Sequence, residues 1–195
     1  ALKIGALLPQ ASNNFITFFS AAGAVGAIEG NGAGISLNTT GADFAECVPL
    51  ASGQQVGPGD VVGIVDGRLT LDTSSAHQFA AISTRPAVVG NMAPAGTAQA
   101  RVALLGQTPV KVRGRVSAGD VLVPSGLNDG AAIALSAQQA IDAGRFDIIG
   151  TAWESSDSDT VKHVRAAIGM LSSLFSLLQA SLGAGAKPRK RRPRK

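Results

Sequence analysis

The strongest constraint on the fold is a succession of short apolar runs broken by turn-forming residues. Between residues 47 and 135, runs of four to six residues rich in Val, Ile and Leu are separated at short spacing by Gly, Pro, Asn and Asp. β-branched side chains favour strands, and Gly, Pro, Asn and Asp favour the turns that join them. The pattern predicts a mainly β protein built from short strands.

One sequence pattern occurs twice in this region, at an offset of 60 residues, beginning at Val56 and at Val116. Each copy contains a Gly turn, then Asp60 or Asp120, and then an apolar run. Turn aspartates commonly accept hydrogen bonds from the backbone of their own turn, so we expect both to cap their turns. The repeat predicts a small β-barrel or β-clip-like domain.

The N-terminal segment carries strands that a single chain cannot cover. Residues 15–19 are apolar at nearly every position instead of alternating with polar residues. Such a strand has to be covered on both faces, which a segment of this length cannot do for itself. We therefore expect residues 1–42 to be the end of an intertwined trimeric β stalk. The alternative is an ordinary buried strand in a monomer.

The C-terminal third changes period more than once. Residues 136–144 predict a short helix with Ser136 as N-cap and Gly144 as its stop. Residues 146–149 and 161–168 have strand character. Residues 170–183 then carry apolar side chains on one helical face, which predicts an amphipathic C-terminal helix that packs on the body or on symmetry mates.

The net positive charge of the chain comes from its C-terminal residues. Residues 187–195 hold seven of the 17 basic residues, so the formal net charge of +4 does not describe the rest of the chain. Two prolines and mutual repulsion predict that residues 184–195 form a disordered basic tail. The tail would contact nucleic acid or an anionic surface, unless it is a plain solubilising terminus.

The sequence lacks the residue patterns of several common kinds of functional site. The two histidines and Cys47 are far apart in sequence and lack the spacing of metal ligands, and no phosphate-binding loop is present. No disulfide can form within a chain with one cysteine. We expect no cofactor, no metal and no small-molecule substrate. The missing initiator Met and secretory signal favour the end of a longer polypeptide.

A compact acidic motif lies between the stalk and the β region. It reads Gly41-Ala42-Asp43-Phe44-Ala45-Glu46, with two carboxylates three positions apart after a Gly-Ala pair. A carboxylate beside a peptide bond can activate a water molecule or attack the carbonyl. The alternative is a capping box, in which both side chains satisfy backbone donors.

This motif resembles the GAD-aromatic-AE signature of a self-cleaving intramolecular-chaperone domain. That family, classed with the glutamic peptidases, is found at the C-terminal ends of phage appendage and tail-spike proteins. The likeness extends over roughly residues 13–169 in a fixed order of short segments. They are residues 14–19, 23–28 and 34–40 before the motif, and 56–62, 88–91, 106–112, 118–126 and 149–154 after it.

The resemblance implies a cut between Ala42 and Asp43 that frees the stalk from a chaperone and autoprotease domain at 43–169. Glu46 would be the general base or proton shuttle, and Asp43 would position or assist at the scissile bond. The implied partners are two further copies of the chain and the upstream fibre segment, on a virion tail or a bacterial surface fibre. Cys47 departs from the family pattern, which has an aromatic or polar residue there.

Strand geometry limits how the two carboxylates could cooperate. Residues i and i+3 of an extended strand point to opposite faces. Asp43 and Glu46 can therefore serve one bond only in a tight turn, or if Glu46 comes from a neighbouring chain. Two nearby carboxylates would also raise the pKa of one of them.

Two further functions remain open from the sequence. The domain could be a non-cleaving trimerisation cap of a surface fibre or adhesin, with Asp43 and Glu46 capping a turn. It could also be a β-clip-type enzyme domain acting on a small acid or sugar, although no convergent polar cluster supports that.

Overall fold

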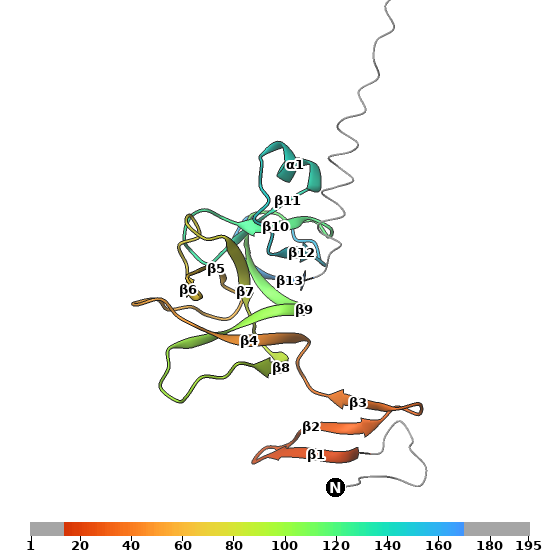
Figure 1. Ribbon diagram of the computed structural model, residues 1–195. Coiled ribbons are helices and arrows are strands. Elements are labelled where there is room, and N and C mark those ends of the chain that lie inside the picture. The colour runs from red at the N-terminus through yellow and green to blue at the C-terminus, as the bar shows by residue number, and fades with distance from the viewer. Residues whose placement is uncertain (1–13, 170–195) are drawn as a thin grey trace, which may run out of the picture.

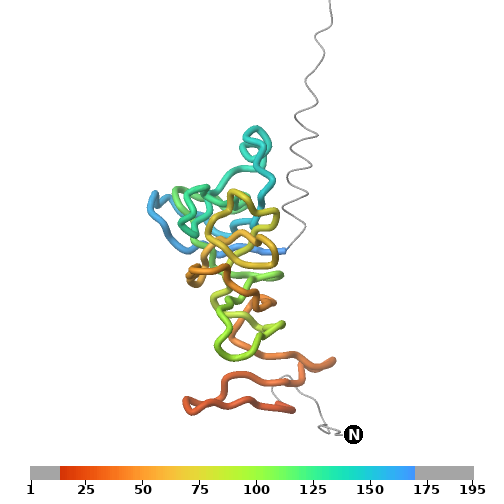
Figure 2. The backbone as a smooth tube through the Cα atoms, turned by 60° about the vertical axis from the view of Figure 1, so that its left-hand side comes forward, coloured from red at the N-terminus to blue at the C-terminus, as the bar shows by residue number. Residues whose placement is uncertain are grey.

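The computed structural model describes residues 14–169 and shows a mainly β protein (Figure 1). The helix expected at 170–183 and the tail expected at 184–195 lie outside the described residues. A three-stranded sheet and a ten-stranded sheet contain all the described strands. The three-stranded sheet lies at one end of the molecule and the only described helix, α1, lies at the other (Figure 2).

The N-terminal sheet is an antiparallel meander. It contains β1 (Asn14–Ser20), β2 (Gly23–Gly30) and β3 (Ile35–Asn38), with β2 in the middle. Asn31 shapes the turn between β2 and β3, because its Oδ1 accepts hydrogen bonds from the amides of Ala33 and Gly34. Residues 14–38 thus form strands, as the sequence predicts, and they make a sheet of only three strands.

The strand that follows, β4 (Asp43–Pro49), connects to the larger sheet. It pairs in parallel with β8 (Pro86–Gly90) and antiparallel with β9 (Gln99–Arg113). The first half of β9 also pairs with β7 (Gln78–Ile82), and from Gly106 onward β9 pairs with β13 (Lys162–Ile168). β9 is therefore shared by two parts of the fold.

The second half of β9 belongs to a five-stranded barrel, which confirms the barrel prediction. The strand order is β9, β13, β12 (Gly150–Ala152), β10 (Val121–Pro124) and β11 (Ala132–Leu135). Parallel pairing of β11 with β9 closes the ring. Buried aliphatic side chains fill it, among them Val110, Val112, Leu122, Val164 and Ala166.

A second, smaller core lies beside the barrel. It is formed by β5 (Val61–Val65), β6 (Arg68–Thr70), β7 and the first half of β9. Asp66 and Gly67 join β5 to β6 with positive φ angles of 48° and 71°, which is the geometry of a two-residue hairpin turn. Leu69 and Val102 are fully buried in this core.

Both turn aspartates act as expected. The Asp60 Oδ2 accepts a hydrogen bond from the Gly57 amide at 2.5 Å, and the Asp120 Oδ2 accepts one from the Ser117 amide at 2.8 Å. Asp60 also forms an ion pair with Lys111, at 2.5 Å.

The predicted short helix is confirmed as α1 (Ala137–Asp142). Ser136 caps it, and the Gln139 side chain completes a capping box. The strand predicted at residues 146–149 is wrong, because β12 begins only at Gly150. Arg145 pairs with Asp147 and also donates to the carbonyl of Pro124, and residues 145–149 form an irregular segment. No helix between residues 14 and 169 has the length and hydropathy needed to cross a bilayer.

Candidate functional site

The site begins with Asp43, whose side chain is buried at the first position of β4. Asp43 lies between Pro86 of β8 and Gly106 of β9 and is only 1% exposed. Its Oδ1 accepts a hydrogen bond from the Ser83 hydroxyl at 3.0 Å, while Oδ2 has no hydrogen-bond partner among residues 14–169. Burial raises the pKa of the Asp43 carboxyl, and the Ser83 hydrogen bond opposes that rise. Asp43 is thus a carboxyl group that holds its proton more tightly than an exposed aspartate does.

The backbone on either side of Ala42 is closely packed. A Cβ at Gly41 would lie 2.2 Å from the carbonyl carbon of Pro86, and a Cβ at Gly106 would lie 2.6 Å from the carbonyl oxygen of Ala42. Gly106 also has a φ of +117°, which other residues rarely adopt. Ala42 itself is exposed, and its amide donates to the carbonyl of Arg85 at 3.3 Å. The Ala42–Asp43 bond therefore joins an exposed alanine to a buried acid.

Glu46 lies on the other face of the strand. Along β4 the side chains of Asp43, Ala45 and Cys47 are buried, while those of Phe44 and Glu46 are exposed. The tight turn that would bring both carboxylates together is absent, because residues 43–49 form a strand. The capping-box alternative is wrong for the same reason, since neither carboxylate caps a helix here. Within one chain, the structure does not bring Asp43 and Glu46 together.

An apolar row crosses the face of the sheet that carries Glu46. Phe44 is 54% exposed, and it pairs in register with Val88 of β8 and Leu105 of β9, which are also exposed. Side chains paired directly across strands lie on the same face. The row defined by Phe44, Val88 and Leu105 therefore lies two residues from Glu46 along β4, on the same side. The sequence motif contains only Phe44 of these three residues.

Sequence reasoning missed Ser83. It lies 40 residues from Asp43 in the chain, and nothing in its local sequence marks it. A second buried oxygen without a hydrogen-bond partner in the described chain, the Thr108 Oγ1, lies two residues beyond Gly106. Only the pairing of β4 and of β7 with β9 relates these residues to the acidic motif.

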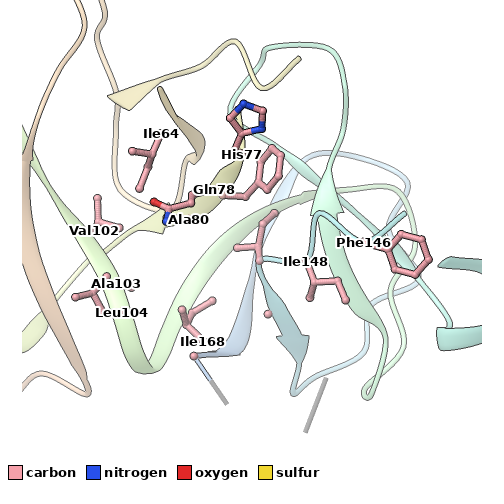
Figure 3. Close-up of a pocket in the computed structure, with 14 residues that line it drawn as sticks. Ile64, His77, Gln78, Ala80, Val102, Ala103, Leu104, Phe146, Ile148 and Ile168 are labelled. Atoms are coloured by element: carbon pink, nitrogen blue, oxygen red, sulfur yellow. The ribbon is translucent and has the colours of Figure 1, made fainter. Parts of the chain in front are cut away.

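A separate groove of about 630 Å³ lies beside the barrel (Figure 3). Its walls are mostly aliphatic and aromatic, with Ile64, Leu104, Phe146, Ile148 and Ile168 among them, and His77 and Gln78 contribute polar groups. None of the described residues that line it is a carboxylate. The groove offers no pair of carboxylates for acid–base chemistry and does not include the Ala42–Asp43 bond.

The described chain offers no metal centre either. Within residues 14–169 there is no group of three or more His, Cys, Asp and Glu side chains able to hold a metal ion. Cys47 is a buried free thiol, and the ring of His163 contacts the carbonyl of Pro58 at 3.2 Å. The candidate site is thus the Ala42–Asp43 bond with its surrounding strands.

These features define a mainly β protein with a small five-stranded barrel and a buried acid at the junction with a flat sheet. The chain matches no family model and no curated protein. It is similar in structure to part of the pre-mature bacteriophage phi29 gene product 12, with a TM-score of 0.47 and 12% sequence identity. The match covers 74% of this chain and 24% of that chain. A likeness at this level does not identify the chain.

Proposed function

We propose that this chain is a C-terminal intramolecular chaperone that trimerises a phage-type tail fibre or spike and then releases itself by cutting the Ala42–Asp43 bond. The observation that carries the proposal is the junction at residues 39–43. There a sheet with an uncovered apolar surface ends, and a well-packed domain begins with a buried acid at the candidate bond.

The uncovered N-terminal sheet supports assembly. Its large apolar side chains are exposed in the single chain, with Phe19 reaching 74%. The other exposed residues of this kind are Phe18, Val25, Ile35 and Leu37. Exposed apolar patches of this kind mark interaction surfaces. Two further copies of the chain, and the fibre segment upstream, are the proposed partners.

The geometry of β4 supports a base that comes from a neighbouring chain. Ala42 and Glu46 are four residues apart, and a strand rises about 3.3 Å per residue, so their Cα atoms are roughly 13 Å apart in one chain. A general base has to act within about 3 Å or through one water. We therefore assign this role to the Glu46 of an adjacent copy, docked on the exposed side of Ala42.

The proposed reaction is a hydrolysis that needs no cofactor. Glu46 of the adjacent copy takes a proton from a water molecule, whose oxygen forms a bond to the carbonyl carbon of Ala42. The bond from that carbon to the nitrogen of Asp43 breaks. The protonated Asp43 carboxyl gives its proton to the departing nitrogen. The products are a carboxyl group on Ala42 and a free amine on Asp43.

Mixed trimers test the proposal directly. The full chain should yield a fragment of 153 residues that starts at Asp43, detected by mass spectrometry, and the Glu46→Gln variant should stay whole while still forming trimers. When Glu46→Gln and Asp43→Asn chains are coexpressed, the Glu46→Gln chain should be cut, because its neighbour supplies the glutamate. Equal cutting by the Glu46→Gln variant alone would make that glutamate structural.

A non-cleaving trimerisation cap is the second candidate. It is favoured by the opposite orientations of Asp43 and Glu46, which leave no catalytic pair in one chain. If the full chain never produces an N-terminus at Asp43, this candidate replaces the first. Under either function, we place the protein on a virion tail or a bacterial surface fibre, and we propose that its basic tail contacts nucleic acid or an anionic surface.

A further inference from the structure

The buried Asp43 carboxyl has one hydrogen-bonding side chain in the described structure, that of Ser83. The Ser83 Oγ lies 3.0 Å from the Asp43 Oδ1, and both residues are at least nine-tenths buried. A hydroxyl group has one proton to donate, and a carboxylate oxygen can only accept it. The contact therefore fixes which Asp43 oxygen is occupied and leaves Oδ2 without a hydrogen bond.

Ser83 is itself held firmly. Its amide donates to the carbonyl of Arg101 on β9 at 2.8 Å. The preceding residue, Ile82, donates to the carbonyl of Asp60 at 2.8 Å and accepts from the amide of Gly59 at 2.9 Å. These bonds fix the backbone of Ser83 against two neighbouring segments. A side chain on a rigid, hydrogen-bonded support can hold a reacting group in one geometry.

The hydrogen bond also decides where the proton of Asp43 resides. An oxygen that already accepts a hydrogen bond from Ser83 is the poorer site for a second proton. As long as Ser83 donates to Oδ1, the proton of a protonated carboxyl sits on Oδ2. Because Oδ1 is engaged, Oδ2 is the oxygen free to hand a proton to another atom.

We propose that Ser83 is a positioning residue for self-cleavage, holding the Asp43 carboxyl so that Oδ2 delivers its proton to the Asp43 nitrogen as the bond from Ala42 breaks. This inference rests on the proposed function. Ser83 keeps its own proton and forms no bond to the substrate. The proton leaves Oδ2 for the nitrogen, and the attacking water supplies the oxygen that completes the new carboxyl group on Ala42.

The test measures the first-order rate at which the fragment starting at Asp43 appears from the full chain. Ser83→Ala removes the hydroxyl and should slow cleavage by about tenfold or more, which is part of the roughly 10²–10⁴-fold that a positioned proton donor supplies. Ser83→Thr keeps the hydroxyl and should remain within about threefold of the parent. In an Asp43→Asn chain, Ser83→Ala should cause no further loss, because Ser83 acts only through Asp43.

A purely structural role for Ser83 would give a different pattern. In that case substitutions of Ser83 would lower the melting temperature. Variants of equal stability would then cleave at the same rate, whether or not they carry a hydroxyl group at position 83. Ser83→Cys, which keeps the side-chain size and weakens the donor, serves where Ser83→Ala fails to fold. If the parent cuts and folded Ser83→Ala and Ser83→Cys cut at the parental rate, this inference alone is overturned. If the parent never cuts, the proposed function fails and the inference fails with it.

Discussion

The N-terminal sheet and the barrel contain similar apolar residues, but these side chains are exposed in the sheet and buried in the barrel. In the barrel, side chains such as Val110, Leu122 and Val164 are essentially inaccessible to solvent. Of residues 14–38, Ala27 has the only buried apolar side chain, although the segment is rich in Phe, Val, Ile and Leu. The difference is topological, because the barrel strands close into a ring and the three N-terminal strands form an open sheet. Apolar strands stabilise a single chain only where the sheet closes on itself or another layer covers it.

The largest expected difference is in the free energy of unfolding when a leucine is replaced by alanine in each region. Leu122→Ala in the barrel should lower the free energy of unfolding by about 3 kcal/mol, because it removes fully buried methyl groups and leaves a cavity. Leu37→Ala in the exposed sheet should change the free energy of unfolding of the dissociated single chain by less than about 0.5 kcal/mol. Urea denaturation of both variants measures this, and equal losses would refute the contrast.

The joint between the two regions gives the next largest effect. Gly106→Ala should destabilise the protein by about 2 kcal/mol, because the positive φ and the contact with the Ala42 carbonyl both resist a Cβ. Gly114→Ala is the matched control: its φ is also positive, at +78°, but nothing lies within 4 Å of the added Cβ. It should cost about 1 kcal/mol. Equal thermal shifts for the two variants would mean that the approach at Gly106 is not restrictive.

A charge on the exposed sheet should weaken assembly without weakening the barrel. Phe19→Asp should raise the dissociation constant of the proposed trimer by about tenfold or more, which corresponds to about 1.4 kcal/mol. Phe146→Asp places the same charge on an exposed phenylalanine near the barrel and should leave assembly unchanged. Analytical ultracentrifugation measures both variants. A stable, folded monomer of the parent at micromolar concentration would contradict the trimer itself.

The smallest expected effect is a pH dependence that arises at the edge of the packed domain. Because the pKa of Asp43 is raised in the folded state, its contribution to stability is complete below the ordinary value of 3.8. That contribution is lost as the pH rises through the folded-state pKa. Asp43→Asn cannot ionise, so its stability should fall less over this range than that of the parent. Parallel denaturation curves at each pH measure the difference, and superimposable pH profiles would show that Asp43 is not buried.

Local patterns were sufficient wherever the structure depends on neighbours in sequence. Ser136 and Gly144 predicted α1 within a residue or two, and Asp60 and Asp120 cap their turns as expected. The strand prediction for residues 146–149 failed because the pairing of Arg145 with Asp147 competes with strand formation. The hydrophobicity of the segment does not reveal this pairing.

The candidate site was only half predictable for a related reason. Asp43 and Glu46 lie in one hexapeptide, and the rule that residues i and i+3 face apart holds in β4. Ser83 and Gly106 reach Asp43 only through the pairing of distant strands. No property of their own neighbours announces that contact, so it had to come from the three-dimensional structure.

The length of β9 affects the order in which folding and cleavage can occur. Its 15 residues extend from the strands around Asp43 into the barrel wall, with one shift of register opposite Phe44 and Ala45. Segments that share a continuous hydrogen-bonded strand tend to open and close as one cooperative unit, so amide exchange should be similarly slow on both sides of Gly106. The surroundings of Asp43 are then complete only in a chain whose barrel has formed. Under the proposed function, the shared strand β9 therefore prevents an incompletely folded chain from cleaving the Ala42–Asp43 bond.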